Sequence, residues 1–253
     1  VLEELEVKPK ILLLENVTGL LSTNGGNNYR VLHEALVDHG YNCGAIVLNA
    51  EFFVPQSRPR VFVIAVQQGV RIPDELVGLE PCWLHNKAAV KLGKTLSNWI
   101  WWRTDKPPLR QTDLSDIIED GVPFDRDDAL RLIPQKHLDK LAAHETVYAT
   151  GYRRTRHGEQ QLEVRDDGIA GCLRTPEGGS SKQYLIVKKD GQLHARLLTV
   201  REAARLMGAP DDFILPGSYN DGYKAMGDAV VAPVAKFLGE RFLTKLTEAA
   251  YNE

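Results

Sequence analysis

The apolar positions of the first seventy residues fall into short continuous runs separated by one segment with helical spacing. Residues 10–15 (KILLLE), 43–50 (CGAIVLNA) and 60–66 (RVFVIAV) predict strands, and the first has the uninterrupted character of a buried parallel strand. Residues 29–40 predict a helix that ends at a glycine. Its expected apolar face consists of Val31, Leu32, Ala35, Leu36 and His39. The order strand, helix, strand, strand predicts an α/β sheet, in which the third strand can pair antiparallel to the second at the sheet edge.

The last fifty residues are also regular. Thr199 and Glu202 have the spacing of a capping box, and they predict a short helix that ends near Gly208. Residues 227–250 predict one long amphipathic helix. Its expected buried stripe consists of Val230, Val234, Phe237, Leu238 and Phe242.

The middle of the chain shows little periodicity. We interpret residues 148–160 as a basic loop and residues 175–183 as a Gly/Ser loop. Asp190 and Gly191 predict a hairpin turn. The tryptophans of residues 99–102 (WIWW) predict packing between irregular segments rather than base stacking.

Composition places the chain among globular proteins. It has 253 residues, of which 43% are hydrophobic and 26% charged, with a formal net charge of -3. Any contact with nucleic acid must therefore come from a local basic patch. We expect a cytoplasmic protein with no membrane contact. Cys43, Cys82 and Cys172 lie far apart, which supports neither a metal site nor a disulfide framework.

Two short stretches place charge where apolar strands end or begin. Glu15 ends the first strand, with Asn16 and Val17 beside it, and strand ends are where ligands bind in open α/β sheets. Taken alone, the glutamate can equally be a carboxylate that caps the next turn. Residues 56–60 (QSRPR) place two arginines before the third strand, and alone these can be surface groups in salt bridges.

Together these motifs form an ordered set. Glu-Asn-Val is followed by Gln-x-Arg-x-Arg at a strand start, then by LTVREAARLMGAPDDF and by YKAMGDAVVAPV. This set resembles the C-terminal half of the DNA (cytosine-5)-methyltransferases, and LRTPEGGSSKQYLIV is similar to the end of their target-recognition region. The resemblance covers residues 1–66 and 170–245 and is diffuse between them.

The resemblance implies an α/β protein: part of an S-adenosylmethionine-dependent, Rossmann-like methyltransferase sheet plus a smaller, irregular target-recognition domain. We expect residues 1–70 to belong to the catalytic domain and residues 71–214 to the recognition domain. Residues 215–253 would return to the catalytic domain.

The same resemblance implies base-flipping chemistry on duplex DNA. Glu15 would handle the proton at N3 of an extruded cytosine, and Arg60 would hold its O2. Arg58 would organise the site or pair with a backbone or carboxylate partner. Asn16, Val17 and Gln56 would support the base pocket.

The resemblance also assigns residues to the cofactor. Gly227, Asp228, Ala229 and Val230 would contact S-adenosylmethionine, with Gly227 allowing a close backbone approach. The family usually has asparagine where Asp228 stands, and an added negative charge beside a nucleotide is unfavourable unless it is paired.

The family's nucleophile is the cysteine of a Pro-Cys-Gln motif, and that motif does not occur in this sequence. Pro81-Cys82 lacks the glutamine and follows Glu-Asn-Val instead of preceding it. We therefore expect the nucleophile, and most of the cofactor site, in an N-terminal half or complementary subunit. Self-association through an unpaired sheet edge is a related expectation. A non-catalytic DNA-recognition subunit remains the alternative.

The recognition region contains the candidate DNA contacts. Three arginines stand close together without a nearby acid in the sequence, and outside this context such a run is usually a solvated face. Within it, phosphate contacts and base reading are expected. The candidate DNA-binding residues are Arg153, Arg154, Arg156, Arg174, Gly178, Gly179, Ser180 and Ser181. The setting would be a bacterial or phage-like, nucleoid-associated enzyme of DNA methylation and restriction-modification.

Overall fold

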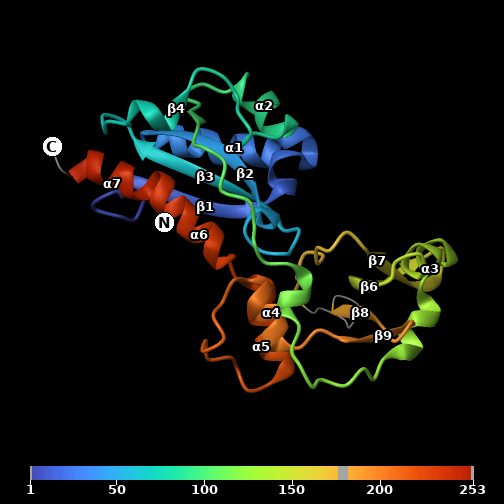
Figure 1. The fold of residues 1–253 in the computed structure, drawn as a ribbon. Helices are drawn as coiled ribbons and strands as arrows, with labels where there is room; N and C mark the ends of the chain where they lie inside the picture. Colours follow the sequence, from blue (N-terminus) through green and yellow to red (C-terminus); the bar gives the residue numbers. More distant parts are fainter. Residues whose placement is uncertain (1, 176–181, 252–253) are drawn as a thin grey trace. The chain divides into compact units, whose positions relative to one another are not determined.

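The computed structural model describes residues 2–175 and 182–251 (Figure 1). The chain forms two compact units. The first comprises Val1–Asn49, Pro59–Pro107 and Lys236–Glu253, and the second comprises Ala50–Arg58 and Pro108–Ala235. The boundaries of these compact units differ from those of the functional domains predicted above. The boundaries of the functional domains stay predictions. No helix within the described ranges is both long and apolar enough to cross a bilayer.

The first unit is built on a three-stranded sheet. Strands β1 (Ile11–Val17), β3 (Pro59–Gln67) and β2 (Tyr41–Asn49) lie in that order, and β3 runs antiparallel to both neighbours. Strands β1 and β2 therefore point the same way, with β3 between them. The predicted antiparallel pairing of the second and third strands is confirmed, but the third strand is central instead of marginal. Strand β1 is half-exposed and its pairing is antiparallel, so the prediction of a buried parallel strand was wrong for these residues.

Helix α1 (Asn27–Asp38) covers one face of this sheet. It buries Tyr29, His33 and Leu36, whereas Val31 is 59% exposed, so the predicted apolar face was rotated from the true one. His33 explains the difference, because its two ring nitrogens are both engaged in the interior. Nδ1 lies 3.2 Å from Sγ of Cys43, and Nε2 lies 2.7 Å from the carbonyl of Ser97.

The opposite face of the sheet packs against the end of the chain. The indole nitrogen of Trp102 donates to the carbonyl of Ile64 at 3.2 Å, and the Trp102 ring meets Phe242 edge-on. The terminal helix consists of α6 (Ala232–Leu238), a π-helical turn (Gly239–Leu243) and α7 (Thr244–Tyr251) (Figure 1). Val230 precedes this helix and is 41% exposed, so its predicted place in the buried stripe was wrong. The other predicted stripe residues, Val234, Phe237, Leu238 and Phe242, are buried.

Short elements complete the first unit. They are β4 (Val77–Gly78), α2 (Lys87–Gly93), β5 (Trp101–Trp102) and the 3-10 turns Thr18–Leu21, Thr23–Gly26 and Asp74–Leu76. Trp102 is fully buried, and the rings of Trp99 and Trp101 lie 5.4 Å apart, so the predicted packing role of this cluster is confirmed.

The second unit contains a four-stranded antiparallel sheet. Its order is β7 (Glu159–Arg165), β6 (Tyr148–Arg156), β8 (Gln183–Lys189) and β9 (Gln192–Leu197). The predicted hairpin at Asp190-Gly191 is confirmed. The predicted basic loop at 148–160 was wrong, because these residues form β6 and the start of β7. His157 and Gly158 make the tight turn between them, with φ of 51° and 84°.

One face of this sheet forms a core with the helices before it. Those helices are α3 (Gln135–Ala142) and the 3-10 turn Asp127–Leu132, and a further 3-10 turn, Leu114–Ile117, precedes them in the chain. The core residues Ala149, Leu162 and Ile186 point to this face. Because side chains alternate along a strand, Thr150, Tyr152 and Arg154 project from the opposite face.

Two helices follow the sheet: α4 (Val200–Leu206) and α5 (Tyr219–Asp228). The predicted capping box is confirmed, since the Glu202 amide donates to Thr199 Oγ1 at 3.0 Å and the Thr199 amide donates to the Glu202 carboxylate at 2.8 Å. Glu202 also accepts two hydrogen bonds from Arg196, at 2.7 and 2.5 Å, and both side chains are almost completely buried. This bidentate pair fixes the start of α4 against β9. The remaining 3-10 turn of this unit is Ala50–Phe52.

Candidate functional site

Glu15 and Arg60 form an ion pair in the first unit. Nε of Arg60 lies 2.9 Å from Oε1 of Glu15, and the two side chains are 17% and 32% exposed, respectively. The strand register explains the contact. Glu15 stands opposite Phe62, and Arg60 is the diagonal neighbour on the same face of the sheet, within reach of two long side chains. The two residues predicted to act on the base are thus brought together at the end of β1 and the start of β3.

The neighbours of Glu15 are oriented by the end of β1. Oδ1 of Asn16 accepts a hydrogen bond from the Val17 amide at 2.8 Å, which is a local turn contact. Val17 is 53% exposed. Their predicted support of a base pocket stays a prediction.

Gln56 lies in the second unit and is fully buried. Its amide nitrogen donates to the carbonyl of Leu206 at 2.7 Å, and its amide oxygen accepts from the backbone nitrogen of Leu173 at 3.0 Å. The side chain thereby joins the end of α4 to the segment that follows β7. A buried amide satisfied on both sides is a rigid structural tie.

Arg58 is also buried and makes a second tie in this unit. Its guanidinium donates to the carbonyls of Leu173, Gly227 and Ala229, each at 2.8 Å. Two of these carbonyls belong to the C-terminal end of α5, where positive charge is stabilising. The predicted alternatives for Arg58 included a backbone partner, and the structure shows that backbone carbonyls accept its hydrogen bonds.

The residues predicted to contact the cofactor lie at the end of α5. A Cβ at Gly227 would stand 2.7 Å from the backbone of Arg174 and Thr175, so this glycine does permit a close backbone approach. The backbone that approaches Gly227 in this structure is that of Arg174 and Thr175. Asp228 accepts a hydrogen bond from the Thr175 hydroxyl, and Val230 is half-exposed.

Arg154 and Arg156 project from the same face of β6 and share one carboxylate. Glu163, from the paired strand β7, accepts from Nε and Nη2 of Arg156 at 2.8 and 2.5 Å, and its other oxygen lies 3.3 Å from Nε of Arg154. The expectation that no acid accompanies these arginines was wrong, because strand pairing supplies an acid that is distant in the sequence.

The environment of Glu163 shifts its titration. Burial acts to raise the pKa of this carboxyl, but hydrogen bonds from Arg156 and Tyr152 and the charge of Arg154 outweigh it, so the pKa is lowered. The pKa of Tyr152 is shifted in the opposite direction. Burial, together with its hydrogen bond to Glu163, raises the pKa of its hydroxyl. The carboxylate therefore stays charged and holds the arginines in place.

Arg153 and Arg174 differ from Arg154 and Arg156, because neither forms an ion pair with Glu163. Arg153 lies 5.2 Å from the ring centroid of Tyr184, and its buried Nε has no hydrogen-bond partner within the described residues. The guanidinium of Arg174 lies 5.9 Å from the ring centroid of Tyr152, and the residue is exposed. The other candidate DNA contacts, Gly178, Gly179, Ser180 and Ser181, lie outside the described residues.

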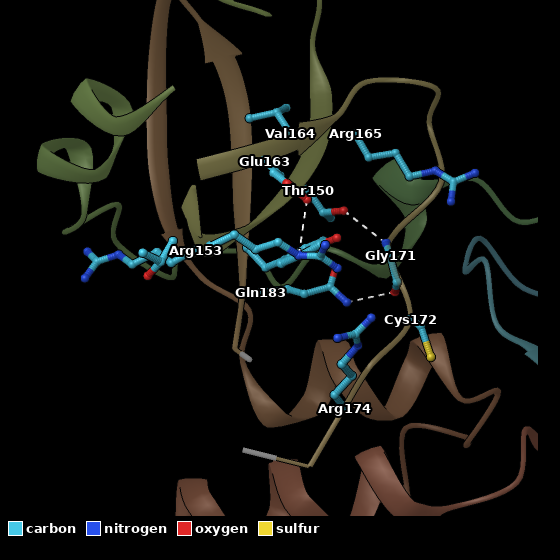
Figure 2. Close-up of a pocket in the computed structure, with 12 residues that line it drawn as sticks. Thr150, Arg153, Glu163, Val164, Arg165, Gly171, Cys172, Arg174 and Gln183 are labelled. Atoms are coloured by element: carbon cyan, nitrogen blue, oxygen red, sulfur yellow. Dashed lines mark hydrogen bonds and ion pairs between the residues drawn. The ribbon is translucent and has the colours of Figure 1, made fainter. Parts of the chain in front are cut away.

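A pocket of about 450 Å³ opens on this face of the sheet (Figure 2). Its lining includes Thr150, Tyr152, Arg154, Glu163, Arg174 and Gln183. Figure 2 shows the Thr150 hydroxyl and the Gln183 amide both bonded to the backbone of Gly171, at 3.3 and 2.7 Å. These bonds hold the segment that leads to Arg174 against the sheet.

Sequence reasoning missed Tyr152, Glu163 and Gln183. A signal was present in residues 159–165 (EQQLEVR), where Leu162 and Val164 alternate with polar residues as in a half-buried strand. The His-Gly turn before them is a weaker turn signal than Asn-Gly or Asp-Gly.

The three cysteines differ in their surroundings. Burial raises the pKa of the Cys43 thiol to about 12, which disfavours the reactive thiolate. Sγ of Cys82 contacts the carbonyl of Trp102 at 3.4 Å, and Sγ of Cys172 lies 3.6 Å from Nη1 of Arg58. Sγ of Cys82 also lies 3.6 Å from Nδ1 of His85.

Comparison with known proteins places these features in a family. The family model described as C-5 cytosine-specific DNA methylase matches residues 5–244, so the chain belongs to this family. Among curated relatives, Type II methyltransferase M.MspI of Moraxella sp is 27% identical over 92% of this chain and 46% of that protein. Type II methyltransferase M.Bsp6I of a Bacillus strain is 26% identical over 92% of this chain and 65% of its own length. The chain thus spans about half to two thirds of these relatives.

Solved structures agree on the fold. The S. pombe Dnmt2 methyltransferase superposes with a TM-score of 0.54 at 18% identity, over all of this chain and 70% of the other. The Entamoeba histolytica methyltransferase EhMeth gives 0.52 at 16% identity, over all of this chain and 65% of the other. The predicted fold class, part of a methyltransferase α/β fold, is confirmed.

Proposed function

We propose that this chain supplies the base-activating and DNA-reading part of a DNA cytosine-5 methyltransferase. The observation that carries the proposal is the Glu15–Arg60 pair, which joins the ends of two strands on one face of the sheet. A purely DNA-binding module has no need of a carboxylate and a guanidinium held together in this way. The pair therefore favours catalysis over the alternative of a recognition subunit.

In this proposal Glu15 and Arg60 act on a cytosine extruded from the duplex. Addition of a thiolate to C6 makes N3 basic, and the Glu15 carboxyl gives and takes the proton there. Arg60 donates to O2, where negative charge grows as the ring is activated. The target atom is inaccessible inside a duplex, so the base must be flipped out. Gln56 and Arg58 hold the segments around Leu173 and the end of α5 in place.

S-adenosylmethionine is the proposed methyl donor, and when bound it supplies the methyl group for C5. The residues predicted to contact it do not form a complete site. The carbonyls of Gly227 and Ala229 accept hydrogen bonds from Arg58, and the Asp228 carboxylate is engaged by Thr175, which leaves Val230 as exposed apolar surface. The proposed role of these residues is to form one wall of a cofactor site whose remainder lies elsewhere.

The nucleophile must also come from elsewhere, since no Pro-Cys-Gln occurs in the sequence. We propose a complementary segment or subunit that carries this motif and adds to the sheet at β1. Within the described residues β1 pairs only with β3, and Leu13 and Val17 on it are exposed. Self-association through the same edge is the competing outcome, and a chain that stays a monodisperse monomer at high concentration in the presence of the segment would count against both.

DNA contact is proposed for the basic face of the second unit. Arg154 and Arg156 lie there beside Glu163, and Arg174 lines the pocket on the same face, although the whole chain has a net charge of -3. Such a local patch suits phosphate contact in duplex DNA. The setting we propose is the DNA methylation of a restriction-modification system.

The test is methyl transfer by this chain combined with a segment that carries Pro-Cys-Gln. Glu15→Gln and Arg60→Ala should each lower the rate at least about 100-fold, with the circular dichroism spectrum unchanged. The matched control is Glu75→Gln, which removes an exposed carboxylate that lies 3.3 Å from Lys245. A rate near wild type in either site variant would refute the assigned roles.

A further inference from the structure

The pocket on the second unit is lined by Arg153, Arg154, Arg165 and Arg174, and within the described residues neither Arg153 nor Arg174 has a carboxylate partner. Arg154 and Arg156 share Glu163, whereas Arg174 forms no ion pair with any carboxylate in residues 2–175 and 182–251. Figure 2 shows its guanidinium rising toward the pocket from the segment after Cys172. The ring of Tyr152 lies beneath it, which limits the orientations of the side chain. A preoriented guanidinium with unused donors is suited to bind two acceptors side by side.

The rest of the lining adds hydrogen-bond acceptors beside the Arg174 guanidinium. Glu163 places a carboxylate in the pocket, and its low pKa keeps it charged. Gln183 is 1% exposed, and its Oε1 has no hydrogen-bond partner within the described ranges. Such acceptors suit a ligand that carries donors as well as acceptors, as the edge of a base pair does. Guanine presents O6 and N7 to the major groove, and arginine pairs with both at once.

We propose that Arg174 reads a guanine in the DNA site through O6 and N7, with Tyr152 fixing the orientation of its guanidinium. This inference rests on the proposed function, because it takes duplex DNA as the ligand. It makes Arg174 a specificity-determining residue, whereas the proposal for Arg154 and Arg156 is phosphate contact. Loss of a base contact relaxes sequence preference, while loss of a phosphate contact weakens all sequences alike.

The experiment uses the full chain and a pool of duplexes randomised over eight positions, with bound molecules sequenced at about 0.1 M salt. Wild type should enrich guanine at one or more positions. Arg174→Ala and Arg174→Lys should both lose one such preference, by roughly 5- to 100-fold in relative affinity, since lysine cannot make the paired contact. The matched control is Arg156→Ala, which should weaken binding to all sequences and flatten the salt dependence.

A second measurement replaces that guanine by 7-deazaguanine, which lacks the N7 acceptor. The replacement should weaken binding by wild type and leave Arg174→Ala unaffected. If wild type binds duplexes and Arg174→Ala keeps every guanine preference, the inference fails while the proposed function stands. If wild type binds no duplex, both fail. Because Arg174 is exposed, its substitution is expected to leave the fold intact, and circular dichroism checks this.

Discussion

Nε of Arg60 lies 2.9 Å from Oε1 of Glu15, although a helix and a complete strand separate the two residues in the sequence. The contact depends on β3 running antiparallel beside β1 with Glu15 opposite Phe62. A shift of one residue in this register would send Arg60 to the other face of the sheet. The pairing of two apolar strands thus sets the geometry of the proposed base-activating pair.

If Glu15 and Arg60 act as a unit, their contributions to the rate of methyl transfer should not be independent. The variant Glu15→Gln/Arg60→Ala should transfer methyl groups about as slowly as the worse single variant, because each group orients the other and serves the same activated ring. Single-turnover rates of the four proteins, combined with the complementary segment, give the coupling directly. If the fold-losses in rate of the two single variants multiply in the double variant, the two side chains act separately.

Arg58 should contribute strongly to the stability of the second unit. Its removal leaves three carbonyls without their charged donor, and each such hydrogen bond contributes about 1.5–3 kcal/mol. We expect Arg58→Met to lower the free energy of unfolding in urea by about 3 kcal/mol or more, and Arg58→Lys to restore little of it. The exposed Arg131→Met is the control and should change stability by less than about 0.5 kcal/mol. An equal effect of the two methionine variants would contradict this role.

The free energy of unfolding should fall in acid because Glu163 becomes protonated and loses its charge. Its pKa is lowered in the folded state, so the stabilisation is fully present above its unfolded pKa of about 4.3 and is lost as pH falls through the folded value. The difference in melting temperature between wild type and Glu163→Gln should therefore be largest at neutral pH and should shrink toward pH 3. A difference that grows as the pH falls would have the wrong sign for this account.

A substitution in the β6–β7 turn should raise the free energy of unfolding. His157 has a φ of 51° and precedes Gly158, and asparagine is favoured over histidine at the first position of such a turn. We expect His157→Asn to raise the free energy of unfolding by about 0.5 kcal/mol. Asp190→Asn in the β8–β9 hairpin is the control, since aspartate already suits that turn, and it should be neutral. A destabilised His157→Asn would argue that the histidine makes contacts that the turn geometry does not reveal.

The sequence predicted the elements whose signals are local. The capping box of Thr199 and Glu202, the hairpin at Asp190 and the three strands of the first unit were all correctly predicted, because each depends on residues close in sequence. The family resemblance assigned Glu15 and Arg60 to the same base, but their direct ion pair was not predicted.

Features that depend on strand pairing were missed. Glu163 neutralises part of the basic patch only because β7 returns beside β6, which a His-Gly turn did not signal. The buried face of α1 was misjudged because His33, a polar residue, finds partners in Cys43 and the Ser97 carbonyl. Hydrogen bonding within the interior can thus outweigh the hydrophobic pattern.

The most direct test of the central claim is covalent trapping on duplex DNA that contains 5-fluorocytosine. Fluorine at C5 blocks the final elimination, so an attacking cysteine stays bonded to C6. With S-adenosylmethionine, the account predicts no denaturation-stable adduct from this chain alone and an adduct once the Pro-Cys-Gln segment is added. With Glu15→Gln, that adduct should be lost. An adduct formed by this chain alone would mean that Cys43, Cys82 or Cys172 is the nucleophile, and it would contradict the division of the enzyme proposed above.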